Sequence, residues 1–279
     1  MANNYEDSLM AVLEISIENL GEKEVKFQLG EYLVQRNPEQ AEIYANELKS
    51  LITIQKDSSD WGRLNYIFAA SHRWQGNYKT ALDYYQQNYD YFKRTNDLEN
   101  IAKSGHFIGS INTFLGNNIL AQKHLLECAE LYSSIGTAKQ KARINNSLAS
   151  FYLNIDQTDK ALEKYKIALE EFTAINDSAG MSSINANLGL LYSELGDFEK
   201  SEAHLLQQKE LNKVFPTLRE MGFHYDFMGI LRERQGRLDE AYDSYLKGLH
   251  IRENLSSTYN LCESKLSLGL SLIHISEPT

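Results

Sequence analysis

The sequence predicts an all-α protein, an α-solenoid in which antiparallel helix pairs stack into a right-handed superhelix. Three observations lead to this prediction. Small residues recur every forty positions, which indicates repeated structural units. The 279 residues include only three prolines, so long helices can run without interruption. Within each unit, apolar residues recur at the three- and four-residue spacing of amphipathic helices.

Two series of small residues and a turn signal between them carry the forty-residue period. The first series is Ala41, Ala81, Ala121, Ala161, Ser201 and Ala241, and the second is Ala69, Gly109, Ala149, Gly189, Gly229 and Gly269. The turn signals are Gly76, Gly116, Asp156, Gly196 and Gly236. Small side chains let two helix axes approach closely, and glycine supports the left-handed residue that ends many helices. Each unit is therefore expected to be a helical hairpin.

The repeat pattern divides the chain into three parts. Residues 1–21 are expected to form a capping helix, because the outer face of a terminal repeat meets water. Residues 22–269 should hold about six hairpins and the start of a seventh. Residues 270–279 form a separate tail. One hairpin illustrates the expected pattern, with a first helix ending at Leu195 and a second running from Asp197 to about Val214.

Helix starts are signalled by side chains that can cap the first turn. Thr137 with Gln140 has the spacing of a capping box, in which each side chain bonds to a backbone N–H of the other residue. Asn96 with Glu99 is a close relative of the same pattern. We therefore expect helices to begin just after Thr137 and just after Asn96.

The segment 185–205 resembles the tetratricopeptide repeat. It has the leucine-glycine pair at Leu188 and Gly189, a tyrosine at Tyr192, the inter-helix Gly196 and the small Ser201. The resemblance covers nearly all of the chain before the tail, although the family's usual tryptophan is replaced and the period is forty rather than thirty-four. Longer repeats of this kind are found in kinesin light chains and bacterial signalling proteins. The resemblance implies a concave groove, lined by the first helix of each pair, that receives a peptide or partner protein.

The last ten residues, LSLIHISEPT, interrupt the start of a seventh unit. They resemble the translated end of a sequencing adapter, and we expect residues 270–279 to be non-native. The alternative is a genuine C-terminal helix. If the tail is non-native, part of the protein, such as an effector domain, is missing after residue 269.

Composition and motifs exclude several function classes. The net charge of −10 argues against nucleic acid, whose binding comes mainly from neutralised phosphates. The sequence contains no HExxH metal motif and no glycine-rich phosphate loop, so we expect no metal site, no cofactor and no catalytic residues in this segment. Cys128 and Cys262 are too far apart to suggest a disulfide framework, and no signal peptide or membrane span is recognisable. These features favour a cytoplasmic protein.

The resemblance places the groove candidates on the first helix of several units. They are Arg63, Tyr66, Arg73, Trp74, Lys103, His106, Arg143, Asn146 and Asn187. Arg63, Lys103 and Arg143 stand forty residues apart and form a predicted basic row. A basic row suits an acidic or phosphorylated partner. The alternative is that these cations pair with acidic residues on neighbouring helices. Asn146 and Asn187 lie near positions at which related repeats bond to the peptide backbone.

The function that this pattern favours is a protein-interaction scaffold, the N-terminal part of a longer bacterial signalling protein. A second interpretation is a stand-alone regulator that binds a signalling peptide or a response regulator. A third is the regulatory half of an enzyme, a histidine kinase or nucleotide cyclase, whose catalytic domain is missing. All three rest mostly on analogy of fold.

Overall fold

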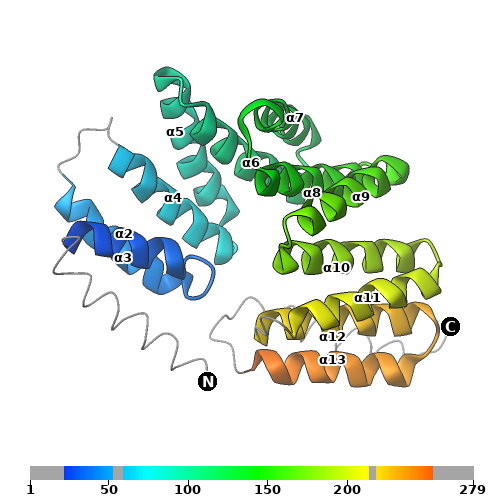
Figure 1. The fold of residues 1–279 in the computed structure, drawn as a ribbon. Coiled ribbons are helices and arrows are strands. Elements are labelled where there is room, and N and C mark those ends of the chain that lie inside the picture. Colours follow the sequence, from blue (N-terminus) through cyan, green and yellow to red (C-terminus); the bar gives the residue numbers. More distant parts are fainter. Residues whose placement is uncertain (1–21, 53–58, 214–217, 254–279) are drawn as a thin grey trace. The chain divides into compact units, whose positions relative to one another are not determined.

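The computed structural model describes residues 22–52, 59–213 and 218–253, and every regular element in these ranges is an α-helix (Figure 1). The chain divides into two compact units, Met1–Ile111 and Asn112–Thr279. The predicted capping helix in 1–21, the restart of a seventh unit and the tail 270–279 lie outside the described residues. No helix within the described ranges is long and apolar enough to cross a membrane.

Unit 1 is built of helical hairpins, as the repeat pattern predicts. Its helices are α2 (Glu22–Leu33), α3 (Pro38–Leu51), α4 (Ser59–Trp74), α5 (Tyr78–Thr95) and most of α6 (Leu98–Phe114). Its core contains Phe27, Leu48 and Ile67, all of which are fully buried. The unit is therefore held by apolar packing between successive helices.

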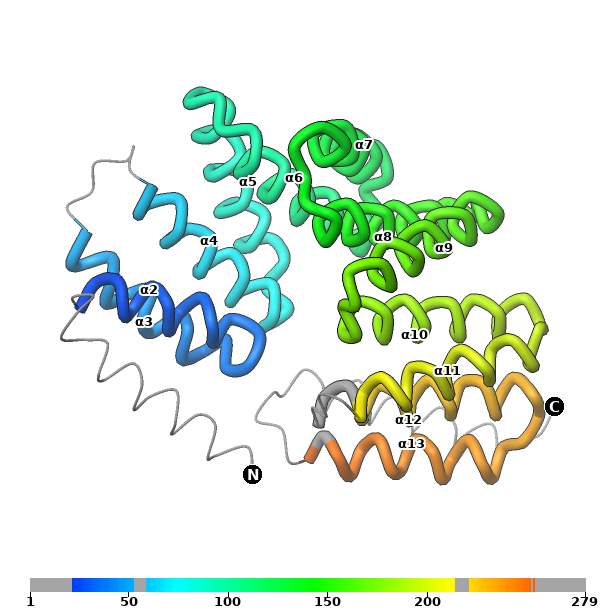
Figure 2. The backbone as a smooth tube through the Cα atoms, viewed as in Figure 1, coloured from blue at the N-terminus to red at the C-terminus, as the bar shows by residue number. Residues whose placement is uncertain are grey.

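Unit 2 continues the same hairpin arrangement. Its helices are α7 (Asn118–Ile135), α8 (Ala138–Asn154), α9 (Thr158–Ala174), α10 (Ser178–Glu194), α11 (Phe198–Asn212), α12 (Leu218–Arg234) and α13 (Leu238–Arg252). Figure 2 shows α10 to α13 side by side, each antiparallel to the next, and each of these neighbouring pairs is in contact. The predicted hairpin with helices ending at Leu195 and about Val214 corresponds closely to α10 and α11.

The first helix of each hairpin forms an inner layer within its unit. We call α2, α4, α6, α8, α10 and α12 the A helices and their partners the B helices. In unit 1 α2 contacts α4, and in unit 2 α10 contacts both α8 and α12. Among the described residues, no two B helices of one unit show such contact. The A helices of each unit therefore approach one another more closely than the B helices do.

The small residues of the repeat lie where two helices cross. Ala41, Ala81, Ala121, Ala161, Ser201 and Ala241 are all fully buried, as predicted. In the hairpin of α10 and α11, the Ser201 hydroxyl donates a hydrogen bond to the Gly189 carbonyl oxygen at 2.7 Å. A larger side chain would push the helix axes apart at this point.

The turns confirm most of the predicted signals and correct one. The four turn glycines and Asp156 all have positive φ, with Asp156 at 57° and Gly196 at 75°. Thr137 and Gln140 form the predicted capping box. The prediction at Asn96 is wrong, because Asn96 is the left-handed residue that ends α5. The next helix is capped by Asp97, whose carboxylate accepts a hydrogen bond from the Asn100 N–H at 3.1 Å.

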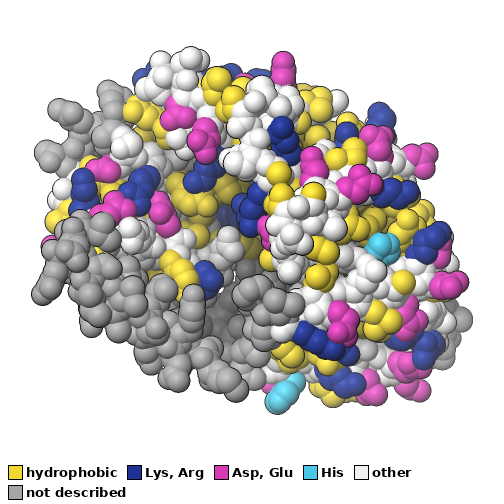
Figure 3. All heavy atoms as spheres, viewed as in Figure 1, with side chains coloured by type: hydrophobic (Ala, Val, Ile, Leu, Met, Phe, Trp, Pro, Cys, Tyr) yellow, Lys and Arg dark blue, Asp and Glu magenta, His cyan; other side chains and the backbone are white. Residues whose placement is uncertain are grey.

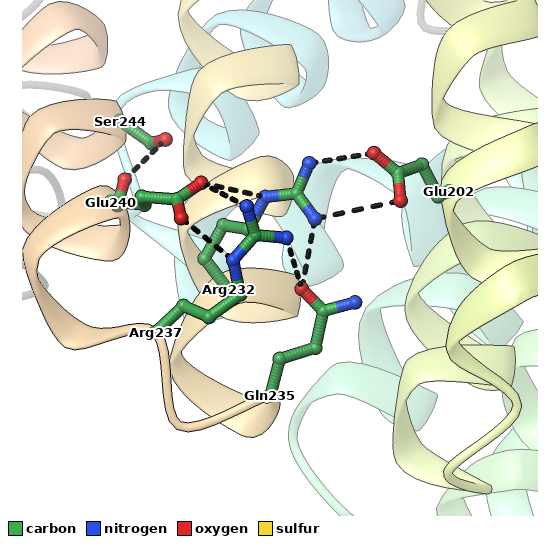
Figure 4. A network of polar contacts seen from close by, with 6 residues as sticks. All are labelled: Glu202, Arg232, Gln235, Arg237, Glu240 and Ser244. Atoms are coloured by element: carbon green, nitrogen blue, oxygen red, sulfur yellow. Dashed lines mark hydrogen bonds and ion pairs between the residues drawn. The ribbon is translucent and has the colours of Figure 1, made fainter.

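A network of charged side chains stabilises the hairpin of α12 and α13 (Figure 4). Arg232 lies 2.6 Å from a Glu202 carboxylate oxygen and 3.6 Å from a Glu240 oxygen, and only 12% of its side chain is exposed. Arg237 also binds Glu240 at 2.6 Å, and both arginines donate to the Gln235 side-chain oxygen. The network connects α13 and the turn before it to α11 through α12.

Candidate functional site

The A faces of the two units carry the residues that the sequence singled out. In Figure 3 the visible face of unit 1 shows Lys and Arg side chains beside Asp and Glu, with hydrophobic side chains between them. Six of the nine predicted residues lie on the A helices of unit 1 and three on those of unit 2. Within the described residues, no group of histidine, cysteine or acidic side chains is arranged to hold a metal ion.

Arg63 on α4 is neutralised by two carboxylates of α2. Its guanidinium lies 2.7 Å from a Glu24 oxygen and 2.9 Å from a Glu31 oxygen, and it also covers the Phe27 ring at 4.2 Å. Partial burial opposes the Arg63 charge, but these hydrogen bonds raise its pKa overall, and the Arg63 hydrogen bond lowers the pKa of Glu24. Arg63 is therefore paired with acidic residues on a neighbouring helix, which is the alternative interpretation of the basic row.

The sequence contained a signal for this ion pair. The first repeat fits the period only when it is shifted by one residue, and this shift puts Glu24 in the register of Arg63. Adjacent repeats therefore bring an acid and a base to the same level of neighbouring A helices. Glu31 lies about two helical turns after Glu24 on α2. Its contact with Arg63 depends on how the two helices pack, and the sequence contains no such signal for it.

Lys103 on α6, the second member of the predicted row, lies against an aromatic ring. Its ammonium group is 3.8 Å from the centroid of the Tyr66 ring, a cation–π contact, and it forms no ion pair with a described carboxylate. The residue keeps much of its surface exposed, yet the loss of hydration at the ammonium lowers its pKa. Lys103 and Tyr66 thus form a cationic and aromatic surface between α4 and α6.

Phe107 on α6, which sequence reasoning did not single out, connects the other predicted residues. Its ring centroid is 5.8 Å from that of Tyr66, 4.8 Å from that of Tyr85 and 5.9 Å from that of His106. The Arg73 guanidinium lies 5.4 Å from the Phe107 centroid. We call the resulting group the cation–aromatic cluster; its members are Tyr66, Arg73, Trp74, Lys103, His106 and Phe107.

Arg73, near the end of α4, is the most confined cation of this cluster. Its guanidinium is 4.6 Å from the centroid of the Trp74 ring, and its Nε is buried without a hydrogen-bond partner. Burial raises the pKa of the neighbouring Tyr85 hydroxyl, and the charge of Arg73 acts in the opposite direction. The site therefore combines a partly buried positive charge with aromatic walls.

The A face of unit 2 holds the remaining three predicted residues. The Asn187 side-chain amide on α10 donates a hydrogen bond to the Asn146 side-chain oxygen on α8 at 3.0 Å. Arg143, one turn before Asn146 on the same helix face, is exposed and forms no ion pair within the described residues. Its charge contributes to lowering the pKa of Asp177, although partial burial alone would raise it and Lys139, 2.6 Å away, is the closer cation.

A surface depression of about 380 Å³ lies elsewhere in unit 2, at the turn between α10 and α11. Glu194 and Arg234 line it and pair with each other at 3.2 Å. Because these charges already satisfy each other and the depression is open to solvent, it is a weaker candidate than the A faces.

Comparison with known proteins connects this geometry to one repeat family. Residues 140–208, which cover most of α8 to α11, match the family model described as tetratricopeptide repeat. The photosystem I assembly protein Ycf3 of Synechococcus elongatus is 34% identical over 100 residues, which is 36% of this chain and 57% of that protein. The matched segment thus spans little more than half the length of this relative.

Two solved structures share the fold over nearly the whole chain. The crystal structure of NprR in complex with its cognate peptide NprX has a TM-score of 0.75 at 18% identity, covering 99% of this chain and 81% of that one. Aspartyl phosphate phosphatase F from Bacillus subtilis has a TM-score of 0.62 at 12% identity, covering 92% and 81% of the two chains. At these identities the likeness concerns the fold, a helical solenoid.

Proposed function

We propose that this chain, which carries tetratricopeptide repeats over residues 140–208, is a protein-interaction scaffold that binds a peptide segment along its A helices. The proposal gains support from NprR, which has the same fold and was crystallised with its cognate peptide. Ycf3, named as an assembly protein, is a relative whose name implies protein partners. The two related interpretations, a peptide-controlled regulator and a regulatory segment of a larger enzyme, use the same surface.

The observation that carries the proposal is the amide pair of Asn146 and Asn187. A side-chain amide offers two N–H donors and an oxygen with two lone pairs. Only one N–H of Asn187 and one lone pair of Asn146 are used in their mutual hydrogen bond. Both side chains are half-buried, so the remaining groups stay accessible at the surface. An extended peptide needs partners for its own N–H and C=O groups, and this pair can supply them.

The chain offers a matched control for this pair. The Asn154 side-chain amide donates to the Asn118 side-chain oxygen at 2.9 Å, which is a second amide pair between neighbouring repeats of unit 2. Both of these residues are exposed and stand at helix ends beside the turns. Removing either pair deletes the same chemical groups, but only the Asn146–Asn187 pair lies on the middle of the A helices.

The experiment measures peptide binding to wild type, Asn146→Ala, Asn187→Ala and Asn154→Ala. The probe is a synthetic array of random dodecapeptides attached through their N-termini, followed by fluorescence polarisation with the peptides that bind. We expect the first two variants to bind at least about tenfold more weakly, because two hydrogen bonds of roughly 1 kcal/mol are lost. Asn154→Ala should bind like wild type. Equal binding by all four proteins would refute the proposed role of the pair, and the absence of any binding peptide would refute the function.

A further inference from the structure

Three arginines of the described chain are partly buried, and they differ in how their charge is balanced. Arg63 binds Glu24 and Glu31, and Arg232 binds Glu202 and Glu240. Arg73 forms no ion pair with any carboxylate in the described ranges, although the chain carries 38 acidic residues against 28 basic ones. A charge withdrawn from water without a counter-ion is unfavourable for folding. The exception at Arg73 therefore calls for a function.

The surroundings of Arg73 leave its hydrogen-bonding capacity largely unused. A guanidinium has five N–H donors in a planar fork that matches a carboxylate. Its Nε is buried without a partner, and its neighbours are the rings of Trp74 and Phe107 and the hydroxyl of Tyr85. Aromatic faces attract the cation but accept no strong hydrogen bond from it. The two terminal nitrogens of the fork, which unlike Nε are not buried, therefore remain available to an anionic group brought by another molecule.

We infer that Arg73 is the anchor of a subsite on the A face of unit 1 for a carboxylate of the bound peptide. This inference rests on the proposed peptide-binding function and names the chemistry that the peptide must bring. Phe107 and Tyr66 form an aromatic surface next to Arg73, and the Lys103 ammonium group lies 3.8 Å from the centroid of the Tyr66 ring. A peptide segment with an acidic residue followed by an apolar one would match this surface, with its carboxylate at Arg73 and its apolar side chain on the rings of Phe107 and Tyr66.

The structure also separates Arg73 from Arg63, which the repeat pattern placed in the basic row. A ligand carboxylate at Arg63 would have to displace Glu24 and Glu31, whereas at Arg73 no carboxylate of the described residues stands in its way. Because hydrogen bonds that involve an ionised donor are about twice as strong as neutral ones, the unpaired arginine gains more from an acidic ligand. Arg73 should therefore contribute more to affinity than Arg63.

The test uses the same dodecapeptide array, with each peptide made in a free-carboxylate form and a C-terminally amidated form. Full-length wild type, Arg73→Gln, Arg73→Lys, Arg63→Gln and Arg94→Gln are compared, since Arg94 is an exposed arginine at the end of α5 in the same unit. Thermal melting of each variant shows whether it is folded. Binding peptides are then remade with Asn or Gln in place of each acidic residue, and with phosphoserine at the same position.

We expect binding peptides to carry an Asp or Glu at a fixed position, or to need the free C-terminus. Arg73→Gln should weaken binding at least tenfold, Arg73→Lys should weaken it less, and Arg63→Gln and Arg94→Gln should change it less than about threefold. If the carboxylate sits on Arg73, neutralising the peptide acid should have little further effect in Arg73→Gln, so the two losses are not additive. A phosphoserine peptide that binds more tightly than its Glu form would refute carboxylate as the preferred anion.

Other outcomes are equally decisive. If peptides bind without any preference for an acidic group, or if a folded Arg73→Gln binds them as wild type does, the subsite is refuted and the proposed function still holds. If no peptide binds to any protein, the proposed function is refuted and the subsite falls with it.

Discussion

Replacing Gly229 by leucine tests the packing of the repeat at a close contact between its two helices. A Cβ atom at Gly229 would lie 2.6 Å from Cε1 and 2.7 Å from Cδ1 of Tyr245 on the partner helix. Carbon atoms in contact are about 3.5–4.0 Å apart, so the ring must move by about 1 Å to accept even this one carbon. The ring is not free to move, because it is buried and its hydroxyl donates to a Glu233 oxygen at 2.8 Å.

The expected loss in the free energy of unfolding follows from this geometry. Overpacking of a buried site costs about 1–3 kcal/mol, and the better helix propensity of leucine returns up to about 1 kcal/mol. For a chain of this size each kcal/mol lowers the melting temperature by about 2–4 °C. Alanine should cost less than leucine, because it adds only the Cβ atom, and Ala149 lies at the same register in a repeat that also has a buried tyrosine, Tyr165.

The assay is urea unfolding followed by circular dichroism at 222 nm for wild type, Gly229→Ala and Gly229→Leu. Hydrogen exchange is measured in parallel, because repeat proteins can lose one hairpin before the others. Faster exchange in the leucine variant should be confined to α12, α13 and their neighbour α11. The double variant with Tyr245→Ala should lose less stability than the sum of the two single losses. An unchanged unfolding midpoint for Gly229→Leu would refute the register assigned to the repeat.

Three further substitutions probe the charges and turns of unit 2. Arg232→Ala should lower the free energy of unfolding by about 1–3 kcal/mol, because Glu202 keeps its charge without a partner. The free energy is measured by urea titration. A change below about 0.3 kcal/mol, which is on the order of the measurement error, would mean that the network adds nothing to stability. Asp177→Asn should cost about 0.5–1 kcal/mol at pH 7 through the loss of its charged contact with Lys139. Since the folded-state pKa of Asp177 is lowered, its contribution is complete above the unfolded-state value of about 4 and disappears as the pH falls, so unfolding curves of the two proteins should converge in acid. Asp156→Gly should raise the melting temperature, since glycine relieves a left-handed backbone that costs other residues about 1–2 kcal/mol, and an unchanged or lower value would contradict this.

Local rules were enough to predict the hairpins and most of their boundaries. A left-handed residue favours glycine, so Gly76, Gly116, Gly196 and Gly236 could be identified as turns without knowledge of the fold. The cap at Asp97 was missed because Asn and Asp stand next to each other, and both can cap a helix or end one. Which of the two residues ends α5 and which caps α6 depends on how far α5 can extend before it meets its neighbours, and this length is set by tertiary packing.

The sequence by itself determined the all-α class, the forty-residue hairpin and the register in which small residues are buried. All of these follow from preferences that act within one repeat and recur at a fixed spacing. The charge balance of individual cations was decided only in the tertiary structure. Arg63 and Arg73 look equivalent as basic residues of the same A helix, yet one meets Glu24 and Glu31 and the other meets Phe107 and Trp74. Coulomb and hydrogen-bond energies depend on distances of a few ångströms between neighbouring helices, and the spacing of residues along one chain does not specify those distances.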